Sequence, residues 1–513
     1  MDKSEINILV IDDDEGTNRN IEKTLLREGY TVDKAYDCLS GMEKIKQSSF
    51  HIVISDLNMP DLNGKLSERA GIDLLHWIRG DHPEIFVLML TGSATVQSAI
   101  DALRLGAKDY LVKPLSPTEL KQKILEVVKA GINFDLKIHY GQGTEPNKKE
   151  DEEVIRRLFV DSSEVNVSLI APGTRGTVVY KVTSRDLEGR WRVPLAIKIA
   201  WKDQILIERD NFNKWVKHRI GGTRYANIID EPVFTSRRGG VKMLFLNTEL
   251  DGLIDFRTFF RAHSTEDVLK TIDNLFDQTL SYWYQTKVFD VLFLVQEYVN
   301  YLKVDKWNLH QDMNRYLKEF ADTEEIYFKE IDTRFSNPVI LFERLLKSEQ
   351  GSEKRTYVST VHGDLHATNI MVDNQKNAWL IDFSNTGLAH ILRDFVELEA
   401  AIKFNVLETE SMRDLCELET CLASQETFRD TLEFSHSDAE IQKAFEIIKL
   451  IRKKASEAIS PNNDFSEYYI GLLFHSLTMI RFFPEAVSQT KKKFILFSVS
   501  KIFEQLMRYG TKL

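Results

Sequence analysis

Short apolar runs separated by amphipathic stretches fill residues 6–130 and limit the folds that this part of the chain can adopt. The stretches between the runs, such as residues 18–28, carry apolar side chains at helical spacing. Alternating strands and helices predict a doubly wound parallel α/β domain whose site lies at the carboxyl ends of the strands. The runs are apolar enough to be buried parallel strands, and they lie at residues 6–11, 51–55, 86–90 and 110–112.

Carboxylates and phosphate-binding side chains stand where these runs end. Asp12 and Asp13 end the first run, Asp56 ends a central one, and Thr91 and Lys113 end the last two. Because the carboxyl ends of parallel strands converge on one edge, three carboxylates meet there and favour Mg²⁺, which prefers oxygen ligands. A carboxylate beside bound Mg²⁺ can attack a phosphoryl donor and become an acyl phosphate. The Thr91 hydroxyl and the Lys113 ammonium can then bind the new phosphoryl oxygens.

This arrangement resembles the response-regulator receiver domain of two-component signalling, over about residues 5–130. The resemblance implies a cognate sensor histidine kinase or phosphotransfer protein as partner, and a second receiver as a partner for a homodimer. One departure is the stretch 61–70, which is longer than usual before the next helix. The residues that the resemblance assigns are the phosphoacceptor Asp56, the Mg²⁺ ligands Asp12, Asp13 and Asp56, and the switch residues Thr91, Tyr110 and Lys113.

A second set of oxygen ligands lies in residues 361–383, where the chain reads Val-His-Gly-Asp-Leu-His-Ala-Thr-Asn and later Leu-Ile-Asp-Phe. An aspartate, an asparagine five residues later and a second aspartate after an apolar strand supply what phosphoryl transfer from ATP requires. Asp364 can orient and deprotonate a hydroxyl group. Asn369 and Asp382 can hold the magnesium ions that carry the triphosphate.

Residues upstream of this string extend the pattern. Gly173 and Gly176 lie between strand-like runs, where a tight turn could bring backbone N–H groups over phosphates, although a plain hairpin turn has the same composition. Lys198 lies in an apolar strand, where burial of its charge is costly unless a partner neutralises it. Glu208 follows at helical distance and is a credible partner.

Taken in order, these parts resemble the aminoglycoside/choline phosphotransferase branch of the eukaryotic-like kinase fold, over about residues 165–400. Glycine between His362 and Asp364, in place of the arginine of protein kinases, matches that branch, as does Gly387 followed by Asp394. The resemblance implies Mg²⁺ and ATP, or another nucleoside triphosphate, as cofactors and an unidentified hydroxyl acceptor. It assigns nucleotide contacts to Gly173, Gly176 and Lys198, support of that lysine to Glu208, the base to Asp364, Mg²⁺ binding to Asn369 and Asp382, and bracing of the catalytic loop to Asp394.

The chain length of 513 residues predicts two to four domains. The predicted fold is a flavodoxin-like receiver followed by an α+β bilobal kinase-like domain with a large helical lobe. Residues 264–330 and 390–513 are mainly helical by periodicity. The expected boundaries are receiver 1–132, linker 133–160, kinase-like N-lobe 161–250 and mainly helical C-lobe 251–513.

Composition excludes several classes of function. The net charge of −11 argues against a nucleic-acid footprint, because phosphate binding requires a basic surface. Three cysteines form neither a disulfide framework nor a metal quartet, which favours a reducing compartment. No segment approaches membrane-spanning length, and the first residues lack the apolar stretch of a signal peptide. We therefore expect a cytoplasmic protein with no nucleic acid and no membrane among its partners.

The favoured hypothesis is a response regulator whose output is an ATP- and Mg²⁺-dependent phosphotransferase, regulated by phosphorylation of Asp56. An alternative is a nucleotide-binding scaffold of the pseudokinase type, which recruits a partner when the receiver is phosphorylated. A third hypothesis is a kinase that modifies proteins. Turnover of ATP distinguishes the scaffold from the two enzymes.

Overall fold

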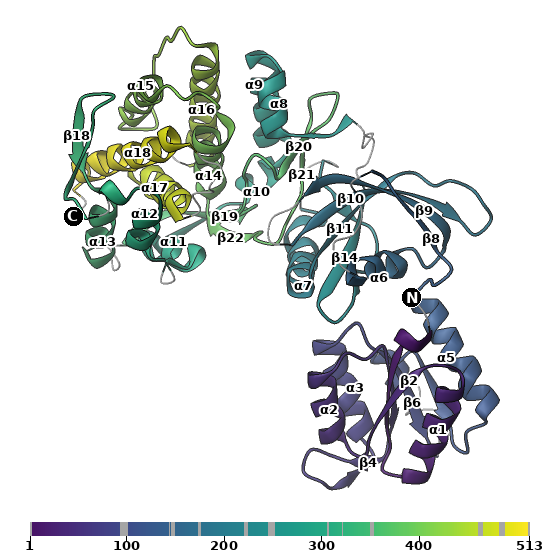
Figure 1. The fold of residues 1–513 in the computed structure, drawn as a ribbon. Helices are drawn as coiled ribbons and strands as arrows, with labels where there is room; N and C mark the ends of the chain where they lie inside the picture. The colour runs from purple at the N-terminus through teal and green to yellow at the C-terminus, as the bar shows by residue number, and fades with distance from the viewer. Residues whose placement is uncertain are drawn as a thin grey trace. The chain divides into compact units, whose positions relative to one another are not determined.

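A computed structural model describes most of the chain, which divides into two compact units (Figure 1). The first unit is Met1–Ile207 with Ile228–Leu244, and the second is Glu208–Asn227 with Phe245–Leu513. The described residues are 3–92, 101–142, 144, 149–172, 176–219, 224–244, 252–304, 307–320, 322–348, 353–459, 465–481 and 488–510.

Within the described residues, the first unit begins with a five-stranded parallel sheet in the order β2-β1-β3-β6-β7; the apolar runs predicted β1, β3, β6 and β7 but not β2. Helices α2 and α3 cover one face and α1 and α5 the other, so the sheet lies between two apolar cores (Figure 1). The bounds are β1 Asn7–Ile11, β2 Thr31–Ala35, β3 Ile52–Asp56, β6 Phe86–Thr91, β7 Asp109–Val112, α1 Glu15–Arg27, α2 Cys38–Gln47, α3 Ala70–Asp81 and α5 Pro117–Gly131.

Two details of this domain differ from the sequence-based expectation. β7 is an edge strand, so Leu111 is buried while Tyr110 and Val112 are 37% and 42% exposed. The longer stretch before α3 contains a small hairpin of β4 (Met59–Pro60) and β5 (Leu66–Ser67). The Asp61 carboxylate accepts two backbone N–H groups of this hairpin, which closes its turn.

A second sheet completes the first unit, in the order β12-β14-β11-β10-β9-β8, with β13 paired to β14. Helix α6 packs on it through Val154, Ile155 and Leu158. Gly240 on β14 permits the close approach, since a Cβ atom there would lie 2.3 Å from Val154 Cγ1. The bounds are α6 Lys149–Leu158, β8 Lys137–Tyr140, β9 Ser162–Pro172, β10 Val178–Asp186, β11 Leu195–Trp201, β12 Asn227–Ile228, β13 Val233–Phe234 and β14 Arg238–Leu244.

The stretch 133–160, predicted to be a linker, therefore contains strand β8 and helix α6. Its run of acidic residues forms the first turn of α6, where negative charge is favourable at a helix N-terminus. One of these residues, Asp151, is buried and pairs with the buried Arg238 at 2.6 Å. The polar composition that indicated a linker thus belongs to a helix held against the second sheet.

Buried polar contacts join the receiver to this second sheet, and we call Glu84, Arg157 and Lys202 the junction residues. Lys202 Nζ donates to Glu84 Oε2 and to the Asp81 carbonyl oxygen, both at 2.8 Å, and Arg157 Nη1 donates to the Glu84 carbonyl oxygen at 3.2 Å. Burial would raise the pKa of Glu84, but hydrogen bonds from His82 and Lys202 outweigh it and lower that pKa. The junction residue Glu84 lies just before the first residue of β6, whereas Thr91 is the last residue of the same strand.

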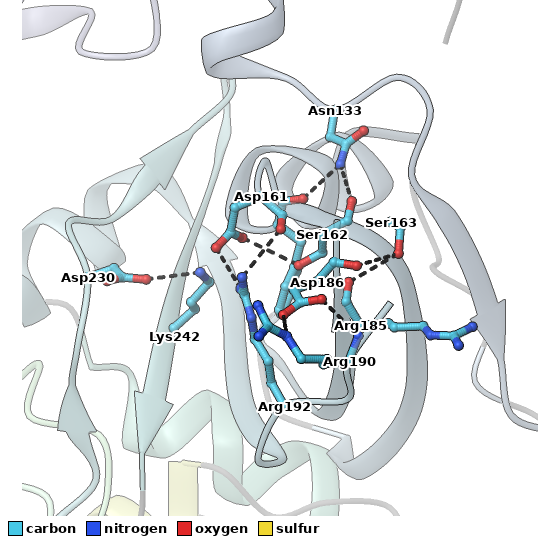
Figure 2. A network of polar contacts seen from close by, with 11 residues as sticks. Asn133, Asp161, Ser162, Ser163, Arg185, Asp186, Arg190, Arg192, Asp230 and Lys242 are labelled. Atoms are coloured by element: carbon cyan, nitrogen blue, oxygen red, sulfur yellow. Dashed lines mark hydrogen bonds and ion pairs between the residues drawn. The ribbon is translucent and has the colours of Figure 1, made fainter. Parts of the chain in front are cut away.

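The end of α5 adds to this connection. Asn133 Nδ2 donates to the carbonyl oxygens of Phe159 at 3.0 Å and Ser162 at 2.6 Å (Figure 2). Nearby, the Arg192 guanidinium pairs with Asp161 at 2.6 Å, which holds the start of β9 to the opposite hairpin (Figure 2). The receiver therefore continues into the second sheet through hydrogen-bonded structure.

The second unit is mainly helical toward its end, as predicted, with α17 and α18 largely buried. Residues 264–330 also contain strands, which the periodicity missed. The helices are α7 Lys202–Asn211, shared between the units, α8 Phe256–Ala262, α9 Thr265–Asn274, α10 Ser281–Gln285, α11 Leu294–Leu302, α12 Leu309–Tyr316, α13 Pro338–Ser348, α14 Arg393–Ala401, α15 Met412–Ala423, α16 Ala439–Ala458, α17 Ser466–Arg481 and α18 Gln489–Arg508.

In the part of this unit that the structure describes, three small antiparallel sheets accompany these helices, in the orders β15-β20-β21, β16-β19-β22 and β17-β18. Among the described helices, none combines the length and the apolar composition that crossing a membrane requires. The strands are β15 Ile254–Asp255, β16 Val288–Phe293, β17 Glu325–Phe328, β18 Thr333–Ser336, β19 Glu353–Val361, β20 Ile370–Val372, β21 Ala378–Leu380 and β22 Gly387–His390.

Removing the junction ammonium should destabilise the first unit. Lys202→Met leaves the buried Glu84 carboxylate without its cation, so we expect a loss of about 1–3 kcal/mol in the free energy of unfolding. Urea titration followed by tryptophan fluorescence measures this loss. Lys137→Met, at an exposed position of β8, is the matched control and should change stability by less than about 0.5 kcal/mol. Equal effects of the two substitutions would contradict the role given to the junction.

Candidate functional site

Three carboxylates meet at the carboxyl edge of the receiver sheet. Asp12 and Asp13 directly follow β1, and Asp56 ends β3. One carboxylate oxygen from each lies within 4.8 Å of the others. Asp12 and Asp56 are buried, while Asp13 is exposed and leaves an approach from solvent. An all-oxygen set of this size fits a hard divalent cation such as Mg²⁺.

Lys113 neutralises part of this acidic cluster. Its Nζ lies 2.6 Å from Asp12 Oδ2 and 2.6 Å from Asp56 Oδ2. Burial raises the pKa of Asp12, although hydrogen bonds from Lys113 and the Asp14 backbone oppose the shift. Burial would lower the pKa of Lys113, but its hydrogen bonds to the two carboxylates outweigh it and raise that pKa. The lysine therefore remains a cation between the two aspartates.

Backbone contacts fix the neighbouring strand ends around Asp56. Thr91 ends β6 and is buried, and its carbonyl oxygen accepts the Lys113 N–H at 2.8 Å. Gly71, at the start of α3, is required by close packing, since a Cβ atom there would lie 2.2 Å from the Asp56 carbonyl oxygen. The structure thus brings together five of the predicted residues, with the sixth, Tyr110, on the exposed edge strand β7.

The second site is the loop that joins β19 to β20. Asp394, at the start of α14, is fully buried and accepts backbone N–H groups from His362 at 2.8 Å and Gly363 at 2.9 Å. Its Oδ2 also accepts the Tyr284 hydroxyl at 2.9 Å. Gly363 has φ +80, and a Cβ atom there would lie 2.3 Å from the Asn385 carbonyl oxygen. One carboxylate therefore holds the backbone immediately before Asp364.

The β20–β21 hairpin carries the proposed metal ligands at its two ends. Asn369 precedes β20 and Asp382 follows β21, and the Ile381 N–H donates to the Asn369 carbonyl oxygen at 3.2 Å. Asn369 Nδ2 donates to the Asp364 carbonyl oxygen at 2.8 Å. Asp382 has φ +66, in the left-handed region that few non-glycine residues adopt. Its Oδ1 accepts the Ser384 hydroxyl at 2.8 Å.

Of the predicted upstream residues that the structure describes, only Glu208 lies in the same unit as this loop. Glu208, on α7, is buried and its Oε1 accepts the Phe383 N–H at 3.4 Å, directly after Asp382. Lys198 is buried on β11 and Gly176 has φ +85, but both belong to the first unit. Gly173 lies outside the described residues. Within the second unit, the geometry therefore concerns Asp364, Asn369, Asp382 and Glu208.

Glu397 is a site residue that the sequence reasoning missed. It lies three residues after Asp394, on the same face of α14, and its Oε2 accepts the Leu365 N–H at 2.9 Å. Burial raises the pKa of Glu397 well above its ordinary value, and the charges of Asp364 and Asp394 raise it further. A neutral carboxyl group beside Asp364 is the result. The Asp-x-x-Glu spacing is the sequence signal that could have identified it.

Other buried groups enclose Glu397. His475 Nδ1, on α17, lies 3.9 Å from Glu397 Oε1, and burial with the charge of Arg393 lowers the pKa of His475 to about 3. The Arg393 guanidinium stacks 3.7 Å from the centroid of the Tyr301 ring. The Tyr301 hydroxyl donates to the Gly363 carbonyl oxygen. Through Tyr301, these groups also contact the backbone of the loop at Gly363.

Comparisons with known proteins identify two families. Residues 8–125 match the family model described as "Response regulator receiver domain". Residues 305–478 match "Ternary complex associated domain 9". The C-terminal match names this family, and a kinase-like fold does not follow from it.

Several relatives share the first domain. The transcriptional regulatory protein ZraR of Klebsiella oxytoca is 27% identical over 292 residues, 55% of this chain and 61% of that protein. The probable transcriptional regulatory protein SilR of Salmonella typhimurium is 32% identical over 24% of this chain and 51% of its own length. The chain thus spans only half to three fifths of these two relatives. The chemotaxis protein CheY-3 of Vibrio cholerae is 37% identical over 23% of this chain and 87% of its own length.

A solved structure shows the same limited overlap. The CheY-like receiver domain from Methanospirillum hungatei is 30% identical and covers 24% of this chain and 91% of its own, with a TM-score of 0.22. The parallel sheet and the family matches define the N-terminal domain as a receiver. The chain belongs to the response-regulator family of two-component signalling, and it carries a ternary complex associated domain 9 in its second unit.

The substitution Glu397→Gln should remove the contribution of Glu397 titration to the pH dependence of the free energy of unfolding. Because the folded protein keeps the Glu397 carboxyl protonated, the wild type loses stability as the pH rises from the ordinary glutamate pKa toward the raised one. Glu397→Gln does not titrate, so its free energy of unfolding relative to wild type should increase between about pH 6 and about pH 8, by up to about 1.4 kcal/mol per pH unit, and its Tm relative to wild type should rise with it.

Scanning calorimetry at both pH values measures this difference, because the other titrating groups are common to both proteins. Glu433→Gln, at an exposed position, is the matched control for the loss of one carboxyl group. A pH-independent difference for Glu397→Gln would contradict a neutral Glu397.

Proposed function

We propose that the receiver is a phosphorylation switch in which Asp56 accepts a phosphoryl group from a sensor histidine kinase or a phosphotransfer protein. The carboxylate cluster within 4.8 Å carries this proposal. Asp12, Asp13 and Asp56 would hold Mg²⁺, which supplies positive charge to the phosphoryl oxygens. An Asp56 oxygen attacks the phosphorus of the donor and displaces the donor group. Lys113, already 2.6 Å from Asp56, can move to a phosphoryl oxygen without crossing the site.

The output that we propose is an ATP- and Mg²⁺-dependent phosphotransferase acting on a hydroxyl acceptor. Its support is the placement of Asp364, Asn369 and Asp382 around one hairpin whose entrance is held by Asp394. Asp364 takes the proton of the acceptor hydroxyl while the new O–P bond forms and the bond to the departing nucleoside diphosphate breaks. Asn369 and Asp382 would hold Mg²⁺, and Lys198 would contact the phosphates.

The receiver can influence this output through the junction residues. They join the β6 end of the receiver to the sheet that carries Lys198, within one compact unit. Phosphorylation of Asp56 shifts the output only by the difference in contact energy between the two receiver states. A change in the position of β6 is the direct way to alter that energy.

A second candidate function is a nucleotide-binding scaffold that recruits a partner without phosphorylating it. The Glu397 carboxyl beside Asp364 favours this alternative, because its hydrogen bond with Asp364 occupies carboxylate oxygens that an acceptor hydroxyl would otherwise use. The family description of residues 305–478, which refers to a ternary complex, favours it as well. ATP turnover separates the two functions.

The receiver proposal is tested with a small phosphodonor. Acetyl phosphate with Mg²⁺ should label the wild-type chain, whereas Asp56→Ala should lose the label completely because the attacking oxygen is removed. Phosphate-affinity electrophoresis measures the labelled fraction, and a chelator should abolish it. Asp33→Ala, an exposed aspartate of the same domain, is the matched control and should label normally. Labelling that persists in Asp56→Ala would assign the phosphoacceptor elsewhere.

The output proposal is tested by ATP consumption over a panel of hydroxyl acceptors. Asp364→Asn should lower turnover by about 100-fold or more while nucleotide binding persists, because only the base is lost. Asp382→Asn should weaken nucleotide binding in the presence of Mg²⁺. Asp322→Asn, at an exposed position, should behave as wild type. Nucleotide binding by the wild type with no turnover of any acceptor would favour the scaffold.

A further inference from the structure

An exposed apolar stripe lies on strand β16 of the second unit. Phe289, Val291 and Phe293 are 44–57% exposed and alternate along the strand, which places them on one face of the sheet. The stripe continues onto the neighbouring strand, where the Tyr357 ring lies 5.5 Å from the Phe289 ring. Large apolar side chains gathered on one exposed strand indicate an interaction surface.

The position of β16 in its sheet makes pairing with another strand feasible. Within the described residues, β16 is the outer strand of the order β16-β19-β22 and pairs with β19 along all six residues. Its other edge presents backbone donors and acceptors that an added strand could satisfy. Soluble proteins usually protect such an edge with a charged side chain, a proline or a bulge. Here Asp290 is the only charged residue of β16, and it lies on the opposite face from the stripe.

The sequence of β16 identifies the strand that fits this edge. The run Phe-Asp-Val-Leu-Phe, residues 289–293, carries Phe, Val and Phe at alternate positions in either chain direction. A two-fold axis through Val291 would place each Phe289 opposite Phe293 of a second copy and Val291 opposite itself. A two-fold interface requires such self-complementarity, because one patch must serve both partners. Asp290 would face Leu292, so like charges would not oppose one another.

The stripe also selects the register. A shift by one residue would place the two stripes on opposite faces of the joined sheet, and a shift by two would leave both phenylalanines of each copy without an aromatic residue directly opposite. We propose that a second copy of this chain pairs antiparallel along β16, with the two-fold axis at Val291. The resulting dimer would join second units, so it differs from any dimer formed through the receiver.

A cysteine at the axis tests the register directly. Val291→Cys should form an intermolecular disulfide with itself, because the two Cβ atoms oppose one another across the axis. Asp290→Cys faces position 292 of the other copy and should not link to itself. Both are made in an Asp56→Ala chain, which keeps the receiver unphosphorylated. The native Cys38, Cys416 and Cys421 are present in both and provide the background. Peptide mass spectrometry locates the link.

Sedimentation velocity tests the surface without oxidation. The Asp56→Ala chain should dimerise with rising concentration, and adding Val291→Lys should weaken dimerisation by at least about tenfold, since two charges would meet at the axis. Val193→Lys, at an exposed β-branched residue of the first unit, should leave the dimer unchanged. Unchanged circular dichroism confirms that each variant is folded. A monomer at every concentration, a dimer that survives Val291→Lys, or a link at 290 rather than 291 would each overturn the proposal.

Discussion

A buried carboxylate is stable only when a cation, hydrogen-bond donors or a proton compensates for lost water, and both candidate sites depend on such compensation. In the receiver the compensation is a cation, because Lys113 lies between Asp12 and Asp56. At the second site it is two backbone N–H groups for Asp394 and a proton for Glu397. These two ways of compensating a buried carboxylate have different consequences. A lysine can exchange one carboxylate for a phosphoryl oxygen, whereas backbone donors hold a loop in one conformation.

Much of the receiver could be predicted from the sequence because its signals are local. Apolar runs mark parallel strands, and the residues that end them must converge on one edge, so Asp12, Asp56 and Lys113 could be placed together. The exposure of Val112 could not be predicted, because apolar composition does not reveal which strand lies at the edge of a sheet. The acidic turn of α6 was assigned to a linker for a related reason, since burial of Asp151 depends on Arg238, far away in sequence.

The second site was predictable in its spacing but not in its surroundings. The interval from Asp364 to Asn369 and the apolar strand before Asp382 predicted that these three residues lie close together, because short motifs constrain local structure; their binding of Mg²⁺ stays a prediction. Glu397 was missed, since its neutral state arises from burial that no local pattern records. Strand β16 was missed as well. Its apolar residues run directly into helix α11, and such a run fits a helix and a strand equally well.

The hydrogen-bonded path from α5 to β9 bears on how such chains could be recombined. Modular exchange of signalling domains assumes that the segment between them is interchangeable. Here an exchange at residue 132 would separate Asn133 from its own helix and leave Arg157 and Lys202 facing a foreign loop. In a functional hybrid, the loop around Glu84 would have to come from the same protein as Arg157 and Lys202. The unit that can be exchanged intact is therefore the receiver together with the second sheet.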